Sequence, residues 1–155
     1  MQNYLKPYIT RAGIITGAIV AVIALIRVFP VVGDIISCLI WPVALIAYLG
    51  AGVLAVMWGK AQGATQTIQQ GAIDGAIAGA IAGVIGGVVT WLVTICRSVL
   101  DAFIFSSGVQ SDVTGVVISI VAGFFGIFFA IIGGAVLGAI GGLIYAAIQQ
   151  SQKKT

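Results

Sequence analysis

The segment from Val113 to Ile148 contains 36 consecutive residues without a charged side chain. As one helix it would be about 54 Å long, well beyond the roughly 30 Å hydrocarbon core of a bilayer. Charged residues make up only 7% of the whole chain and hydrophobic residues 61%, which leaves too few charges to cover a soluble domain of this size. The sequence therefore predicts an integral membrane protein.

The chain is predicted to be all-α, a single transmembrane domain over residues 1–155 with four membrane-spanning helices. Residues Pro30, Gly33 and Asp34 are typical of a turn, and they follow the first apolar segment. The polar stretch 60–70 separates the first two apolar segments from the last two. The sequence thus indicates a four-helix bundle made of two helical hairpins. The predicted helices cover about 12–29, 35–58, 71–105 and 113–148.

The third and fourth predicted helices are longer than a bilayer requires. Arg97 and Asp101 form an i, i+4 pair on a helical pattern that continues to Phe105. One interpretation is a long hairpin whose outer third leaves the bilayer or lies against another apolar surface. The alternative is a re-entrant segment around 98–125, which would have to be buried in protein or line a cavity because lipid cannot satisfy bare backbone groups.

The distribution of basic residues predicts the orientation. With four spans, both termini and the polar linker share one side of the membrane. That side carries five basic residues, Lys6, Arg11, Lys60, Lys153 and Lys154, and the other side carries Arg27 and Arg97. By the positive-inside rule both termini are expected in the cytoplasm.

Small residues recur at every fourth position in all four predicted helices. The longest run is in the third helix and consists of Gly71, Gly75, Gly79, Gly83 and Gly87. The others are Gly13, Gly17 and Ala21; Ala47, Ala51, Ala55 and Gly59; and Ala130, Gly134, Gly138, Gly142 and Ala146. Because the hydrophobic effect cannot pair helices in lipid, close backbone approach over such faces must do so. We expect glycine-zipper packing.

On this topology the small-residue runs fall in the cytoplasmic half of the membrane, and bulky aromatic residues gather in the outer half. They are Phe29, Trp41, Trp91, Phe103, Phe105, Phe124, Phe125, Phe128 and Phe129. We expect a bundle closed on the inside and splayed outside, with grooves that lipid, quinone-like molecules or partner helices could fill. The alternative is that these aromatic side chains simply face lipid.

Asp74 is the one acidic residue inside a predicted span. Intramembrane carboxylates are candidates for ion or proton sites. The alternative is a structural role, because Asp74 is expected in the first turn of the third helix, where the helix N-terminus stabilises an anion.

Two further clusters are expected at the outer membrane boundary. Arg27, Asp34, Arg97 and Asp101 could pair and lock the hairpins together, or bind a phospholipid head group, although exposed interfacial charges contribute little. Cys38 and Cys96 fall at the same level and could form a disulfide, or remain free as ordinary buried apolar residues.

The missing residue types exclude several kinds of chemistry. The chain has no histidine and no glutamate, and its basic residues are dispersed. The usual general base and the commonest ligand for haem iron and zinc are therefore absent. No metal site, cofactor or nucleic-acid partner is predicted, and we do not expect an enzyme.

Several short motifs carry a resemblance. They are Lys6-Pro7 followed by Gly13-xxx-Gly17, the Pro30 turn, Ser37-Cys38-Leu39-Ile40-Trp41, and Asp74-Gly75-Ala76-xx-Gly79-xxx-Gly83. Over residues 4–90 the chain resembles a loose group of uncharacterised small, glycine-rich, four-pass membrane proteins of bacteria and archaea. The resemblance implies a prokaryotic cytoplasmic (inner) membrane protein and no particular activity.

Two functions remain open from the sequence. The first is a structural or accessory subunit that packs against copies of itself or other membrane subunits, with lipids around it. The second is a channel or transporter formed by oligomerisation, with Asp74 in the pathway, although few polar residues lie within the spans.

Overall fold

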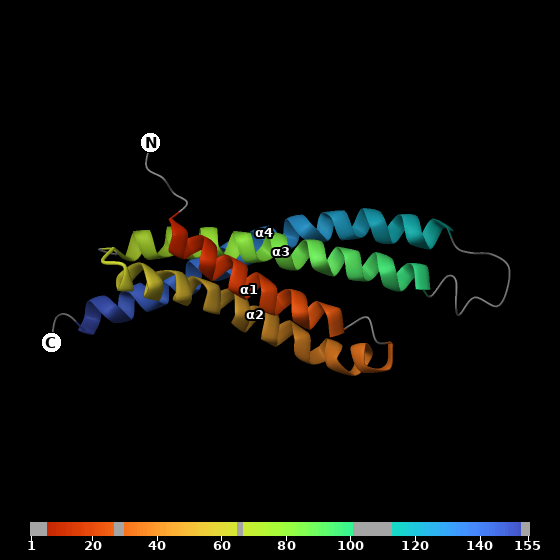
Figure 1. Cartoon of the computed structure of the whole chain (residues 1–155), viewed down its shortest axis with the longest axis horizontal. Coiled ribbons are helices and arrows are strands. Elements are labelled where there is room, and N and C mark those ends of the chain that lie inside the picture. Colours follow the sequence, from red (N-terminus) through yellow and green to blue (C-terminus); the bar gives the residue numbers. More distant parts are fainter. Residues whose placement is uncertain (1–5, 27–29, 65–66, 101–112, 153–155) are drawn as a thin grey trace.

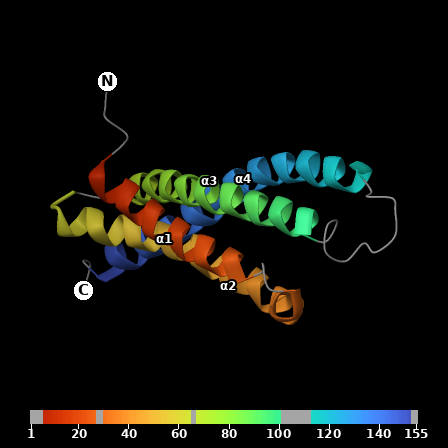
Figure 2. The ribbon, with the colours of Figure 1, turned by 45° about the vertical axis from the view of Figure 1, so that its right-hand side comes forward.

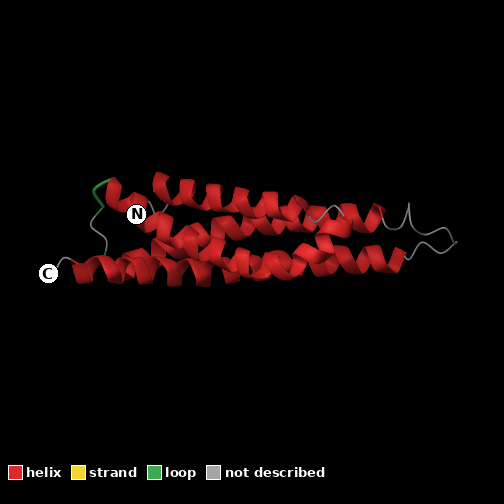
Figure 3. Cartoon of the chain, turned by 90° about the horizontal axis from the view of Figure 1, so that it is seen from below, coloured by secondary structure: helices red, strands yellow, loops and turns green. Residues whose placement is uncertain are grey.

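Four α-helices account for almost all of the described chain (Figure 1). The computed structural model describes residues 6–26, 30–64, 67–100 and 113–152, with the backbone alone for 30–41 and 113–116. The helices are α1 (Pro7–Ile26), α2 (Pro30–Ala61), α3 (Ile68–Leu100) and α4 (Val113–Gln152). No strand occurs in these ranges (Figure 3).

All four helices are long and apolar enough to cross a membrane, as the sequence predicted. The predicted starts of the first three helices are too late, and α2 and α4 end at Ala61 and Gln152, after the predicted 58 and 148. The segment 30–34 was expected to be a turn, but α2 begins at Pro30, because proline fits the first position of a helix, where its missing N–H has no partner to lose. The first helix begins at Pro7, five residues earlier than predicted, for the same reason.

The junction of α2 and α3 is built from two capping motifs. Gly63, with φ of 77°, ends α2, and the bonds from Ala64 N to Gly59 O and from Gly63 N to Lys60 O make a Schellman motif. Thr67 and Gln70 then bond each other's backbone N–H through their side chains. This capping box starts α3 at Ile68, three residues before the predicted start.

The helices pack in a fixed order. Along the α3–α4 contact, Gly71 lies against Gly142, Gly79 against Gly134 and Gly83 against Ala130, so the two helices are antiparallel. Figures 1 and 2 show them side by side. α1 runs parallel to α3, and α2 runs parallel to α4. Within the described residues α1 and α4 do not pack together.

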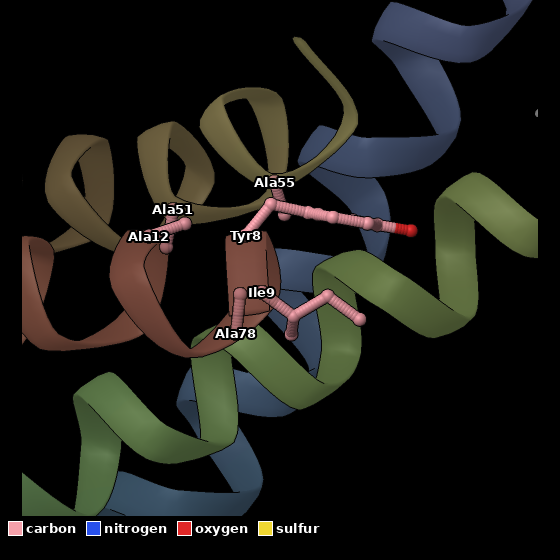
Figure 4. Close-up of a cluster of buried hydrophobic side chains, with 6 residues drawn as sticks. All are labelled: Tyr8, Ile9, Ala12, Ala51, Ala55 and Ala78. Carbon is pink, nitrogen blue, oxygen red and sulfur yellow. The ribbon is translucent and has the colours of Figure 1, made fainter. Parts of the chain in front are cut away.

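The core lies where α1, α2 and α3 meet (Figure 4). Four of its six residues are alanines, and all six are at most 3% exposed. They are Tyr8, Ile9, Ala12, Ala51, Ala55 and Ala78. Small side chains allow the helix backbones to approach closely, so dispersion between them replaces the hydrophobic effect that lipid cannot supply.

The bundle has two different halves. The compact half, residues 7–17, 49–61, 68–83 and 134–152, contains most of the buried residues. In the open half, residues 18–26, 30–48, 84–100 and 113–133, α1 and α2 diverge from α3 and α4 (Figure 2). Side chains from Val117 to Gly133 are all at least partly exposed, whereas Gly134 is buried. This asymmetry leaves space between the helix pairs.

The two charged residues of α3 mark the thickness of the apolar layer. Asp74 and Arg97 bracket 22 uncharged residues, about 33 Å of helix, close to the roughly 30 Å core of a bilayer. α4 continues past both levels. Just beyond Arg97, Ser98 of α3 donates a hydrogen bond to Ser119 of α4 at 3.4 Å. Both helices are continuous as far as they are described; residues 101–112, where a re-entrant turn was considered, lie outside the described ranges.

Candidate functional site

The glycine run of α3 lies directly on the backbone of α4. A Cβ placed on Gly75, Gly79 or Gly83 would overlap the carbonyl oxygen of Gly138, Gly134 or Ala130. The reverse holds as well, since Gly134, Gly138 and Gly142 meet the carbonyls of Gly79, Gly75 and Gly71. At the ends of the run the contacts are looser: a Cβ on Gly71 would lie 2.8 Å from the Ala146 Cβ, and one on Gly87 would lie 3.3 Å from that of Ala130.

The two α1 glycines contact a different face of α3. A Cβ on Gly13 would lie 2.8 Å from the Cβ of Ile81, and one on Gly17 would lie 2.9 Å from that of Ile85. The ten glycines of the runs in α1, α3 and α4 therefore all lie at contacts within the chain.

Two close contacts between α2 and α4 were not predicted. Gly52 lies against the Gly138 carbonyl, and Gly141 lies against the Leu49 carbonyl. Neither belongs to a run spaced by four. The sequence therefore carried no local signal for these two contacts.

Asp74 is buried between α1 and α3 with 6% of its surface exposed. The Tyr8 hydroxyl, itself on a side chain 3% exposed, donates to Asp74 Oδ2 at 2.8 Å. The predicted role in the first helical turn is wrong, because α3 starts at Ile68 and its first turn contains no acidic residue. The carboxylate is held by a side chain from another helix.

Lys6 lies at the entrance to this pair, just before α1. Its ammonium is 5.7 Å from the centre of the Tyr8 ring. Hydrogen bonding to Tyr8 and a weaker attraction to Asp74 raise the pKa of Lys6 above 10.5. The three residues form a stack that runs from the solvent-exposed Lys6 to the buried carboxylate.

A cavity of about 400 Å³ occupies the open half between all four helices. Its walls are apolar except for the hydroxyl groups of Tyr48 and Thr90. The lining residues are Val20, Ile23, Ala24, Ala44, Leu45, Tyr48, Thr90, Phe129, Ala130, Gly133, Gly134 and Leu137. Phe129 is 75% exposed, so the cavity opens sideways toward the surroundings of the bundle. Its volume lies at the lower end of the range of small-molecule sites, roughly 300–1,000 Å³.

The other predicted clusters are only partly described. Arg97 is half-buried, whereas Arg27, Asp101 and the side chain of Asp34 lie outside the described residues. Cys96 is a free, exposed thiol, so the bridge considered from the sequence is not formed in this structure; the side chain of Cys38 lies outside the description.

The described residues contain no group of three or more cysteine, aspartate, glutamate or histidine side chains able to hold a metal ion. No protein-family model, curated protein or solved structure matches the chain.

Proposed function

We propose that the chain is a non-catalytic structural or accessory subunit of a membrane assembly, containing either copies of itself or other membrane proteins. Two hairpins, α1–α2 and α3–α4, locked by glycine-zipper packing, would form its rigid body. Its setting would be a prokaryotic inner membrane with both termini in the cytoplasm, since five of the seven basic residues fall on that side.

The observation that carries this proposal is the contrast between the two halves of α4. The compact half is in backbone contact with α3 through Gly134, Gly138 and Gly142. The open half of the same helix has no buried residue between Val117 and Gly133. Four phenylalanines in this stretch, Phe124, Phe125, Phe128 and Phe129, are between 52% and 75% exposed.

Aromatic surface of this kind suits contact with a neighbouring helix. Aromatic side chains bury a large area and are enriched at protein interfaces. Phe125 and Phe128 both contact the ring of Phe124 edge to face. The Phe124–Phe128 ring centroids are 5.3 Å apart. Phe124, Phe125 and Phe128 would act as one preformed patch, which lowers the entropy cost of association.

The experiment is the mass of the protein after gentle extraction from its native membrane. A subunit is expected as a discrete complex whose protein mass exceeds the 15.8 kDa of one chain. Replacing Phe125 and Phe128 together by Leu should reduce that complex, and replacing the exposed Leu25 and Val22 of α1 by Ala should leave it intact. A wild-type protein that is a lone 15.8 kDa chain in every mild detergent would contradict the proposal.

The alternative of an ion pathway through an oligomer has less support. Asp74 would have to line that pathway, yet its side chain lies inside the bundle and accepts a hydrogen bond from Tyr8. Flux through proteoliposomes that is abolished by Asp74→Asn would favour the pathway over the structural role.

A further inference from the structure

Tyr48, one of the residues that line the cavity in the open half, ends in a hydroxyl group. Tyr48 projects from α2 so that its oxygen lies beside Gly86 of α3, where a Cβ would come within 3.2 Å of it. Among the described residues this hydroxyl has no hydrogen-bond partner. The tyrosines of the compact half differ, since Tyr8 is bonded to Asp74.

The Tyr48 hydroxyl also lies near the middle of the apolar layer. Gly86, beside it, stands 12 residues after Asp74 and 11 before Arg97. At about 1.5 Å per residue the hydroxyl is therefore about 16–18 Å from the charged level on either side. Thr90, the other polar residue of the wall, is one turn further out.

This depth restricts what can fill the cavity. A hydroxyl without a hydrogen-bond partner is unfavourable in hydrocarbon, and an acyl chain offers it no acceptor. The ester and phosphate oxygens of a phospholipid lie at the edge of the roughly 30 Å core, too far from its centre to reach Tyr48. The matching occupant is uncharged, dissolves in the bilayer interior and carries its own acceptor oxygen.

We propose that the cavity is a binding site for a membrane-soluble quinone-type molecule, whose ring carbonyl accepts a hydrogen bond from Tyr48. The flat ring lies between the apolar walls of α1, α2 and α4, and the hydrocarbon tail leaves past Phe129 into the lipid. The hydroxyl of Thr90 is placed one turn along α3 to contact a second ring oxygen. The proposal concerns binding alone and requires no electron transfer.

Two substitutions test the site in different ways. Tyr48→Phe removes the hydroxyl and keeps the ring that lines the wall. Gly133→Leu is designed to fill the cavity: Gly133 is a lining residue, and a Cβ there meets nothing within 4 Å, so the first carbon of the new side chain is accommodated. Gly126→Leu is the matched control, since Gly126 is on the same helix, is equally open and is not part of the wall.

The probe is a 1,4-benzoquinone with a two-isoprene tail, and the comparison probe carries the same tail on a benzene ring without carbonyls. Native mass spectrometry of the full chain in detergent micelles measures occupancy. The wild-type chain should bind one quinone, and Tyr48→Phe should weaken it about 3- to 10-fold, as expected for one neutral hydrogen bond. Gly133→Leu should remove the adduct, and Gly126→Leu should keep it.

Three results would overturn the proposal. The first is equal binding of the quinone by the wild-type chain and by Tyr48→Phe. The second is equal binding of the quinone and its carbonyl-free analogue by the wild-type chain, which would make the cavity a space for any hydrocarbon. The third is a quinone adduct that survives Gly133→Leu, which would place the molecule elsewhere.

Discussion

The hydroxyl of Tyr8 and the carboxylate of Asp74 are 2.8 Å apart although 66 positions separate them in the chain. This bond ties the first turn of α1 to the second turn of α3. Both side chains are buried, and the small residues Ala12, Ala55 and Ala78 pack around the same region. Asp74 is thereby part of the contact between α1 and α3.

The first prediction concerns this bond. Tyr8→Phe leaves the buried Asp74 carboxylate without the Tyr8 donor, and it should lower the free energy of unfolding by about 1–3 kcal/mol. Tyr145→Phe on α4 is the matched control and should change it little, since Tyr145 makes no hydrogen bond among the described residues. Thermal unfolding in detergent measures both. Equal losses in the two variants would show that the Tyr8–Asp74 bond contributes nothing specific.

A second prediction tests the backbone contact of α3 with α4. Gly79→Ala places a methyl group against the Gly134 carbonyl, and neither backbone can move aside cheaply. It should destabilise the protein by about 1–3 kcal/mol, as overpacking does. Gly50→Ala meets nothing within 4 Å and should instead stabilise by about 0.5–1 kcal/mol through helix propensity. If both variants shift the melting temperature upward, the close contact is not present.

Gly63 gives a third prediction, outside the membrane-spanning segments. Its φ of 77° belongs to the left-handed region, and its N–H and that of Ala64 close the end of α2. Gly63→Ala should cost about 1–2 kcal/mol because a Cβ is strained in this conformation. Gly63→Asn should recover part of the loss, since asparagine tolerates the left-handed region best after glycine. Identical unfolding curves for Gly63→Ala and Gly63→Asn would contradict the left-handed conformation of Gly63.

The fourth prediction is a pH dependence. The pKa of Lys6 is raised above 10.5 in the folded chain by Tyr8 and Asp74. A raised pKa means that the contribution of Lys6 to stability is complete below pH 10.5 and is lost as the pH rises through the folded value. The stability difference between the wild type and Lys6→Gln should therefore be constant from neutral pH upward and shrink only above the usual lysine pKa of about 10.4. A difference that vanishes between about pH 6 and pH 8 would point to another group.

The helices were predictable because lipid imposes a simple rule on them. A chain with 61% hydrophobic residues can satisfy its backbone in a membrane only within helices or a closed barrel, and the lengths of the apolar segments fixed their number. The ends were less predictable. Proline at position 30 and the Thr67–Gln70 pair both start helices, yet they look like parts of polar turns in the sequence.

The site was predictable only where the signal is local. The run Gly71 to Gly87 predicts a helix face without side chains, whichever helix packs against it. The partner of Asp74 could not be predicted, because Tyr8 comes from a different helix and any tyrosine near that level would have served. The cavity depends on the divergence of α1 and α2 from α3 and α4, which no spacing within one helix encodes.

Site-specific photo-crosslinking in the native membrane tests the central claim most directly. A photoreactive side chain at Phe125, 59% exposed on the open half of α4, is compared with one at Leu25, 53% exposed in the open half of α1. A subunit that contacts its neighbours through the phenylalanine patch should give a protein adduct of discrete mass at Phe125 and lipid adducts alone at Leu25. Lipid adducts alone at both positions would contradict the account.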